Sequence, residues 1–125
     1  MVDRDGSGET GLRKDPVLGV DKRDTTYVVK LGGELDLYNA HQVRDALFEV
    51  CSDSPQRIVV DLGEVDFIDS TALGVLIEAR TKLDNRGAFM LAAPGFETRR
   101  ALEISGLDRH FTVHKTVPEA LDAKI

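Results

Sequence analysis

Three consecutive residues near the middle of the chain, Asp69, Ser70 and Thr71, carry side chains that could do chemistry. They stand in the segment VDFIDSTALG, where a run of apolar residues gives way to a helical pattern. A carboxylate or hydroxyl at such a junction can cap the helix, because its oxygen accepts a hydrogen bond from a free backbone N–H. A serine can also act as a nucleophile or accept a phosphate. The segment is therefore a cap, a nucleophile or a regulatory switch.

The residues around Ser70 disfavour a catalytic serine. A nucleophile elbow has the pattern Gly-x-Ser-x-Gly, whereas Ile68 and Ala72 occupy the two glycine positions here. No glycine-rich run followed by lysine precedes the helix, so a phosphate-binding loop is excluded. Asp61 ends a predicted strand, as in a phospho-aspartate receiver, but the acidic cluster and late lysine of receivers are not evident. The histidines show neither a triad context nor metal-ligand spacing: His41, His110 and His114. We therefore predict no enzymatic activity, no metal and no cofactor.

The helix that starts at this segment is predicted to expose Ser70. At 100° per residue, one side of the helix collects apolar side chains and faces the core: Ala72, Leu76, Ala79 and Leu83. The opposite side collects Ser70, Gly74, Glu78 and Thr81. A phosphate on Ser70 would add about −1.5 to −2 charge, which a helix N-terminus tolerates. Phosphorylation would therefore spare the fold and change how a partner meets this face.

The elements that must position this segment alternate between strands and helices. Apolar runs rich in β-branched residues predict strands at 17–20, 26–33, 57–62, 88–93 and 110–114, with a turn at 21–24. Helical periodicity predicts helices at 39–51, 70–87, 98–106 and 118–125. A leading hairpin followed by β-α units predicts an α/β fold, in which about four helices cover a mixed, mostly parallel sheet of about five strands.

Local signals predict how the helices begin, end and pack. Asn39 is expected to cap the first helix, and Gln42 completes a capping-box pattern. Gly87 is expected to end the second helix. Ala101 and Ile104 are expected to share one face of the third, with Leu102 flanking it.

Length and composition exclude several classes of protein. The chain has 125 residues, 42% of them hydrophobic, which fits one soluble domain. Residues 1–15 are rich in glycine and charge and predict a flexible tail, leaving 16–125 as the domain. A net charge of −6 argues against nucleic-acid binding. No apolar run approaches the ~20 residues of a membrane helix. The N-terminus has no secretory signal, and a single cysteine, Cys51, agrees with a cytoplasmic setting.

Three segments closely resemble the anti-sigma factor antagonists, STAS-domain proteins also called anti-anti-sigma factors. They are GGELDLYNA (32–40), RIVVDLGEVDFIDSTALGVLI (57–77) and LEISGL (102–107). The Gly-Glu-Leu-Asp and Asp-Ser-Thr segments are the most specific, and both follow the order and spacing of the family. The resemblance covers about residues 17–124, and it implies the STAS-domain fold.

The resemblance also implies a phosphorylation switch. In such proteins the unphosphorylated antagonist binds an anti-sigma factor that is also a serine kinase, so that a sigma factor is released for transcription. The kinase phosphorylates the serine after the motif aspartate, which matches Ser70, with Thr71 as a secondary acceptor. A metal-dependent, PP2C-type phosphatase restores the unphosphorylated form. The residues predicted to face the partner are Asp36, Asp69, Ser70, Thr71, Gly74 and Glu78.

One alternative within the resemblance stays open. The domain could be a STAS scaffold in a stress-sensing complex, or a regulatory subunit associated with transport, without a phospho-switch. The Asp69-Ser70 pair favours the switch, because a module without phosphoregulation needs no acceptor there. We expect a monomer, since no broad exposed apolar stripe is evident in the sequence.

Overall fold

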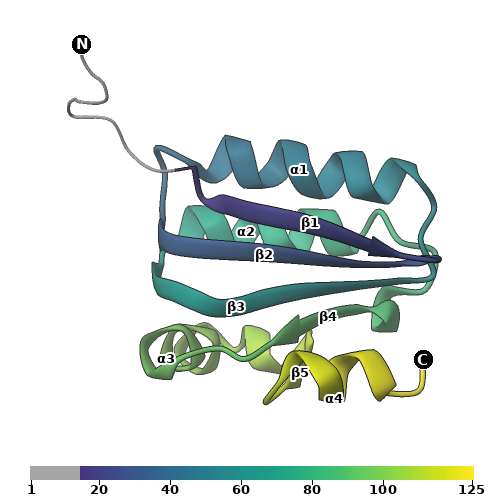
Figure 1. Ribbon diagram of the computed structural model, residues 1–125. Coiled ribbons are helices and arrows are strands. Elements are labelled where there is room, and N and C mark those ends of the chain that lie inside the picture. Colours follow the sequence, from purple (N-terminus) through teal and green to yellow (C-terminus); the bar gives the residue numbers. More distant parts are fainter. Residues whose placement is uncertain (1–14) are drawn as a thin grey trace, which may run out of the picture.

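The central sheet has five strands in the order β1-β2-β3-β4-β5. The computed structural model describes residues 15–125. β1 (Val17–Arg23) is antiparallel to β2 (Thr26–Leu35), and the next three strands run parallel to β2: β3 (Arg57–Ile68), β4 (Phe89–Ala92) and β5 (Thr112–His114) (Figure 1). The predicted mixed, mostly parallel sheet is therefore confirmed. The predicted tail falls on residues 1–14, outside the described part of the chain, apart from Asp15.

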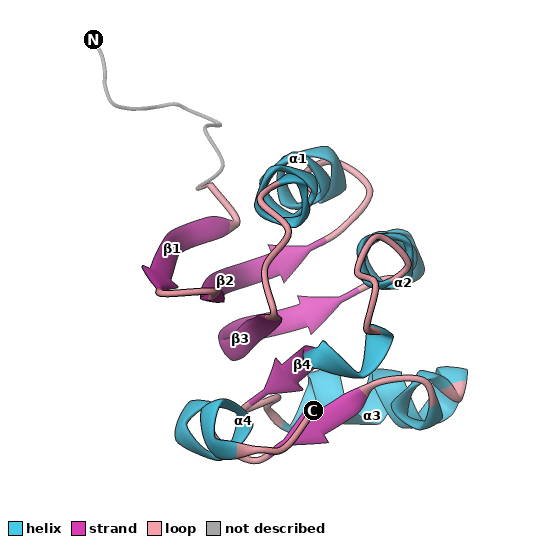
Figure 2. Cartoon of the chain, turned by 90° about the vertical axis from the view of Figure 1, so that its right-hand side faces the viewer, coloured by secondary structure: helices cyan, strands magenta, loops and turns pink. Residues whose placement is uncertain are grey.

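Four α-helices connect or follow the strands, as predicted. They are α1 (Ala40–Ser52), α2 (Ser70–Arg80), α3 (Phe96–Ser105) and α4 (Val117–Asp122), with short 3-10 turns at η1 (Arg86–Ala88) and η2 (Leu107–Arg109). Figure 2 shows α1 and α2 on one side of the sheet and α4 on the other. The three longer helices bury their apolar side chains in the same main core.

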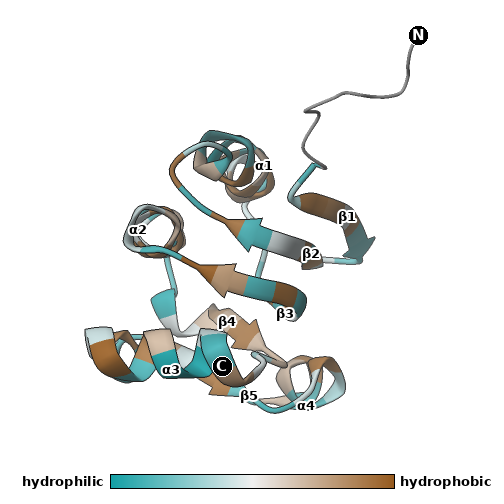
Figure 3. Ribbon diagram, turned by 90° about the vertical axis from the view of Figure 1, so that its left-hand side faces the viewer, coloured by the Kyte–Doolittle hydropathy of each residue, from teal (hydrophilic) through white to brown (hydrophobic). Residues whose placement is uncertain are grey.

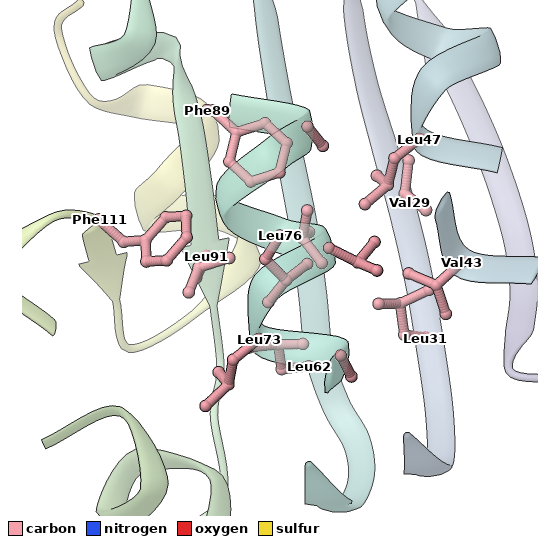
Figure 4. Packing of buried hydrophobic residues seen from close by; sticks show 14 of the residues in the cluster. Val29, Leu31, Val43, Leu47, Leu62, Leu73, Leu76, Phe89, Leu91 and Phe111 are labelled. Carbon is pink, nitrogen blue, oxygen red and sulfur yellow. The ribbon is translucent and has the colours of Figure 1, made fainter. Parts of the chain in front are cut away.

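The core forms because side chains alternate between the two faces of each central strand. Val29 and Leu31 of β2 lie near Val43 and Leu47 of α1 (Figure 4), and Ile58 and Val60 of β3 belong to the same buried cluster. The side chains at the alternate strand positions point to the other face. There a smaller cluster forms with α4, and it consists of Val28, Val59, Met90, Ala92 and Ala120. The predicted inner side of α2, from Ala72 to Leu83, is buried as expected.

Several predicted boundaries are wrong. β3 ends at Ile68 and not at residue 62, and α4 ends at Asp122 and not at residue 125. Two other boundaries have a local physical cause. The first is the turn at 21–24, because β1 continues to Arg23 and the turn lies at Asp24, whose φ is +57°, and Thr25. The second is the end of α2, which stops at Arg80 and not at Gly87. The Thr81 hydroxyl donates to the Glu78 carbonyl at 2.6 Å, and Asn85 accepts from the Gly87 N–H to begin η1. These local side-chain bonds offer the backbone an alternative to the helix.

On α3 the predicted apolar face departs from the structure at Ile104, whereas Ala101 packs partly against the core. Thr98 and Leu102 are fully buried, whereas Ile104 is 75% exposed. Ile104 lies two residues beyond Leu102, which is roughly 200° around the helix at 3.6 residues per turn. Hydrophobicity favoured Ile104 for the core, but the position of the helix against β3 buries the Thr98 face.

Candidate partner-binding site

The predicted site lies where two parallel strands end side by side. β2 and β3 pair in a register that places Leu35 opposite Ile68, the last residue of each strand (Figure 1, left end of the sheet). The Asp69 N–H donates to the Leu35 carbonyl at 3.0 Å. The loop that follows β2 and the first turn of α2 are therefore neighbours, although 32 residues separate Leu37 from Asp69.

Asp69 binds both of these segments through its carboxylate. One oxygen, Oδ1, accepts from the Ala72 N–H at 3.0 Å and caps α2. The other oxygen, Oδ2, accepts from the Leu37 N–H, also at 3.0 Å. The sequence left Asp69 or Ser70 as the N-cap; the structure assigns the cap to Asp69 and leaves Ser70 as the first helical residue. The sequence predicted the cap but not the bond to Leu37, which depends on strand register.

Ser70 and Thr71 are exposed at the start of α2. Neither hydroxyl makes a hydrogen bond within the described part of the chain. The Ser70 oxygen is therefore exposed, and no hydrogen bond within the described residues depends on it. Such a hydroxyl can accept a phosphate without breaking an existing hydrogen bond.

The loop after β2 is held by the side chain of Asn39, which is 5% exposed. Its Oδ1 accepts from the Asp36 N–H at 2.9 Å, and its Nδ2 donates to the Glu34 carbonyl at 2.7 Å. Asp36 contributes by accepting from the Tyr38 N–H at 3.0 Å. The predicted capping box is wrong, because the Asn39 side chain caps no helix N–H. Its oxygen is used to close the loop instead.

This loop exposes two large apolar side chains, Leu37 at 64% and Tyr38 at 74%. Phe67, near the end of β3, is also exposed. Figure 3 shows hydrophobic segments at the ends of β2 and β3 and in the loops leading to α1 and α2. These three side chains are exposed apolar positions near the start of α2. Leu37 and Tyr38 were missed because hydropathy predicts burial, whereas a strand-to-helix turn offers no core position.

The remaining predicted partner residues lie further along α2. Gly74 is exposed, and Glu78 forms an ion pair with Arg44 of α1 at 3.2 Å. The hydrogen bond to Glu78 and its charge raise the pKa of the Arg44 guanidinium. Arg44 also lies over the ring of Phe48, 4.3 Å from its centroid. Glu78 thus takes part in an ion pair between α2 and α1.

Residues 15–125 offer few groups for other chemistry. No set of three or more His, Cys, Asp or Glu side chains among them could hold a metal ion. Burial raises the pKa of the Cys51 thiol and so disfavours the reactive thiolate. Within the same residues, every helix is too short or too polar to cross a membrane.

The fold and the site define a small α/β domain that presents a helix N-terminus beside an apolar loop. Residues 18–120 match the STAS domain family, and the chain belongs to that family. It is 36% identical over 94 residues to the anti-sigma-F factor antagonist RsfB of Mycobacterium tuberculosis. The match covers 75% of this chain and 77% of that protein. It is also 36% identical over 87 residues to the anti-sigma-B factor antagonist of Staphylococcus aureus, covering 68% and 80%.

Solved structures agree with this assignment. The crystal structure of an anti-sigma factor antagonist from Mycobacterium paratuberculosis superposes with a TM-score of 0.76 at 35% identity, covering 82% of this chain and 87% of that one. The unphosphorylated anti-sigma factor antagonist SpoIIAA has a TM-score of 0.71 at 23% identity, covering 83% and 92%, and supports the fold alone. The predicted family and the predicted STAS fold are confirmed.

Proposed function

We propose that this protein is an anti-sigma factor antagonist controlled by phosphorylation of Ser70. The unphosphorylated form binds an anti-sigma factor that is also a serine kinase, and the sigma factor is released for transcription. Phosphorylation of Ser70 by that kinase ends the interaction, and a PP2C-type phosphatase restores it. The protein works in the cytoplasm as a regulator and not as an enzyme. The names of its relatives support the antagonist role.

The observation that carries the proposal is the state of Ser70. Its hydroxyl is exposed and makes no hydrogen bond within the described residues, and Asp69 beside it already caps the helix. A kinase can therefore reach the oxygen without opening the fold. The added phosphate stands at the positive end of the helix dipole, which favours an anion. The folded state is expected to tolerate the phosphate.

A bound partner experiences the phosphate differently. The docking surface we propose consists of Leu37, Tyr38 and the exposed face of α2, next to the carboxylate of Asp69. A partner packed closely on this surface would have to bury a dianion, and burying an unpaired charge is strongly unfavourable. Phosphorylation thus acts on binding and leaves the domain folded.

The proposal is tested by incubating the protein with purified anti-sigma factor serine kinases and ATP, followed by phosphate mapping with mass spectrometry. We expect phosphate on Ser70, its absence in Ser70→Ala, and its persistence in the matched control Thr71→Ala. Ser70→Ala should still bind the kinase, whereas Ser70→Asp should bind weakly with an almost unchanged melting temperature. A protein that binds an anti-sigma factor but is never phosphorylated would be a STAS scaffold without a switch.

A further inference from the structure

An open hollow of about 400 Å³ beside the first residues of β1 is lined by acidic side chains. Its charged lining residues, all of them exposed, are Asp15, Glu34, Glu64 and Asp66. None of them forms an ion pair with another residue of the described part of the chain. Because like charges gathered in one place repel one another, a positively charged segment that covered the hollow would be stabilised there.

The hollow also offers an apolar contact. Leu18 of β1 is 52% exposed and lies over Gly32 of β2, where a Cβ atom would come within 2.6 Å of the Leu18 Cδ1 atom. The same Cβ atom would lie 3.3 Å from the Cβ atom of Glu64, so Leu18 and Glu64 approach this glycine from the two neighbouring strands. A segment that combines an apolar side chain with positive charge complements this lining.

The chain itself supplies such a segment. Residues 12–14, Leu-Arg-Lys, come directly before Asp15, which lines the hollow. The carbonyl of Pro16 accepts from the Gly32 N–H at 2.9 Å, so the chain is held at the edge of the hollow at this point. Two residues of extended chain span at most ~7 Å. Both basic side chains can therefore reach the carboxylates.

We propose that residues 12–14 bind in this hollow, where Arg13 and Lys14 face its carboxylates and Leu12 packs on Leu18. A segment of the same chain is favoured over a separate molecule, because closing a short connection costs little entropy and keeps the effective concentration of the segment high. The folded unit then begins at residue 12 and not at residue 16.

The position of the hollow places this segment beside the partner-binding site. Because β1 is antiparallel to β2, it begins at the end of the sheet where β2 and β3 end (Figure 1). Asn39, whose side chain holds the loop after β2, also lines the hollow. The bound segment would lower the negative charge next to this loop and extend the surface that the loop presents. The inference does not depend on phosphorylation of Ser70.

The test follows the melting temperature and the NMR spectrum of the full chain. Arg13→Ser and Lys14→Ser should each shift backbone amides of the hollow that are distant from the change in sequence, namely Gly33, Glu34 and Glu64. Each variant should also lower the melting temperature by roughly 1–3 °C, as expected for the loss of one exposed ion pair. The matched control Arg4→Ser removes the same charge further from the hollow and should leave these amides and the melting temperature unchanged.

A charge exchange identifies the contact more directly. Arg13→Glu and Glu64→Lys should each lower the melting temperature, and the double variant should recover much of both losses. High salt should remove the difference between the wild type and Arg13→Ser, because exposed charges are screened. The amide shifts of the wild type should not change on dilution, since the segment belongs to the same chain.

Three results would overturn the inference. If Arg4→Ser and Arg13→Ser shift the hollow amides equally, the effect is one of overall charge and not of a contact. If the wild-type spectrum approaches that of Arg13→Ser on dilution, the occupant is a second copy of the chain. If neither Arg13→Ser nor Lys14→Ser changes the hollow amides, residues 12–14 do not occupy the hollow, and it is open to a basic segment of another protein.

Discussion

Replacement of Asp69 should separate its two roles, because each carboxylate oxygen serves a different segment. Asp69→Ala removes the cap on Ala72 and the bond to Leu37 together. Loss of an N-cap costs about 1 kcal/mol. Loss of the partly exposed bond to Leu37 costs about 1 kcal/mol more. The expected loss in the free energy of unfolding is therefore about 2 kcal/mol, or roughly 8 °C in melting temperature for a domain of this size.

Asp69→Ser keeps one role and removes the other. A serine at the N-cap still accepts from the Ala72 N–H, since serine caps as well as aspartate. Its short side chain has one oxygen and cannot also bind Leu37, 32 residues away in the sequence. The expected loss is about 1 kcal/mol, half that of Asp69→Ala.

Urea unfolding measures the two losses, and amide hydrogen exchange by NMR shows where they arise. In Asp69→Ser the Leu37 amide should exchange faster while the Ala72 amide stays protected. In Asp69→Ala both amides should exchange faster. Equal losses in the two variants, or an unchanged Leu37 amide in Asp69→Ser, would refute the assignment of separate roles to the two oxygens.

Three further predictions concern other parts of the structure. Asn39→Ala should cost about 2 kcal/mol in urea unfolding, because two buried backbone groups of the loop lose their partner. Arg57→Met should speed hydrogen exchange throughout α4, because the guanidinium donates to three carbonyls at its C-terminal end. Hydrogen bonds from Tyr27 and Lys22, and the charge of Lys22, hold the pKa of Asp53 below its ordinary 3.8. The stabilisation by charged Asp53 is complete above that value and declines as pH falls through the lowered pKa. Asp53→Asn should therefore reduce the fall in melting temperature between about pH 5 and pH 2.

Much of the fold could be predicted because the core positions repeat with the period of their element. In α2 the inner side chains recur at helical spacing, and Leu76 and Ala79 are fully buried. The errors arose where a local contact competes with that period. At the end of α2 the Thr81 hydroxyl binds the carbonyl of Glu78, and further on Asn85 accepts from the Gly87 N–H where η1 begins. Such competition between a side chain and the backbone is not visible in hydropathy.

The candidate site was predictable only in its local part. The pair Asp69-Ser70 predicts a helix cap at this junction, and the structure assigns the cap to Asp69. The bond from Leu37 to Asp69 depends on the pairing of β2 with β3, which places Leu35 opposite Ile68. Register of this kind is set by the whole sheet, so no short segment of sequence contains it.

Asp69 caps the helix and Ser70 carries the free hydroxyl, and these separate roles explain how one junction can serve both stability and regulation. If Ser70 were the cap, a phosphate on its oxygen would replace the hydrogen bond that begins the helix, and modification would alter the fold. Because Asp69 accepts the Ala72 N–H, the Ser70 oxygen is left without a structural role. Under the proposed function, the charge added at Ser70 is then felt mainly by whatever docks on the exposed face of α2.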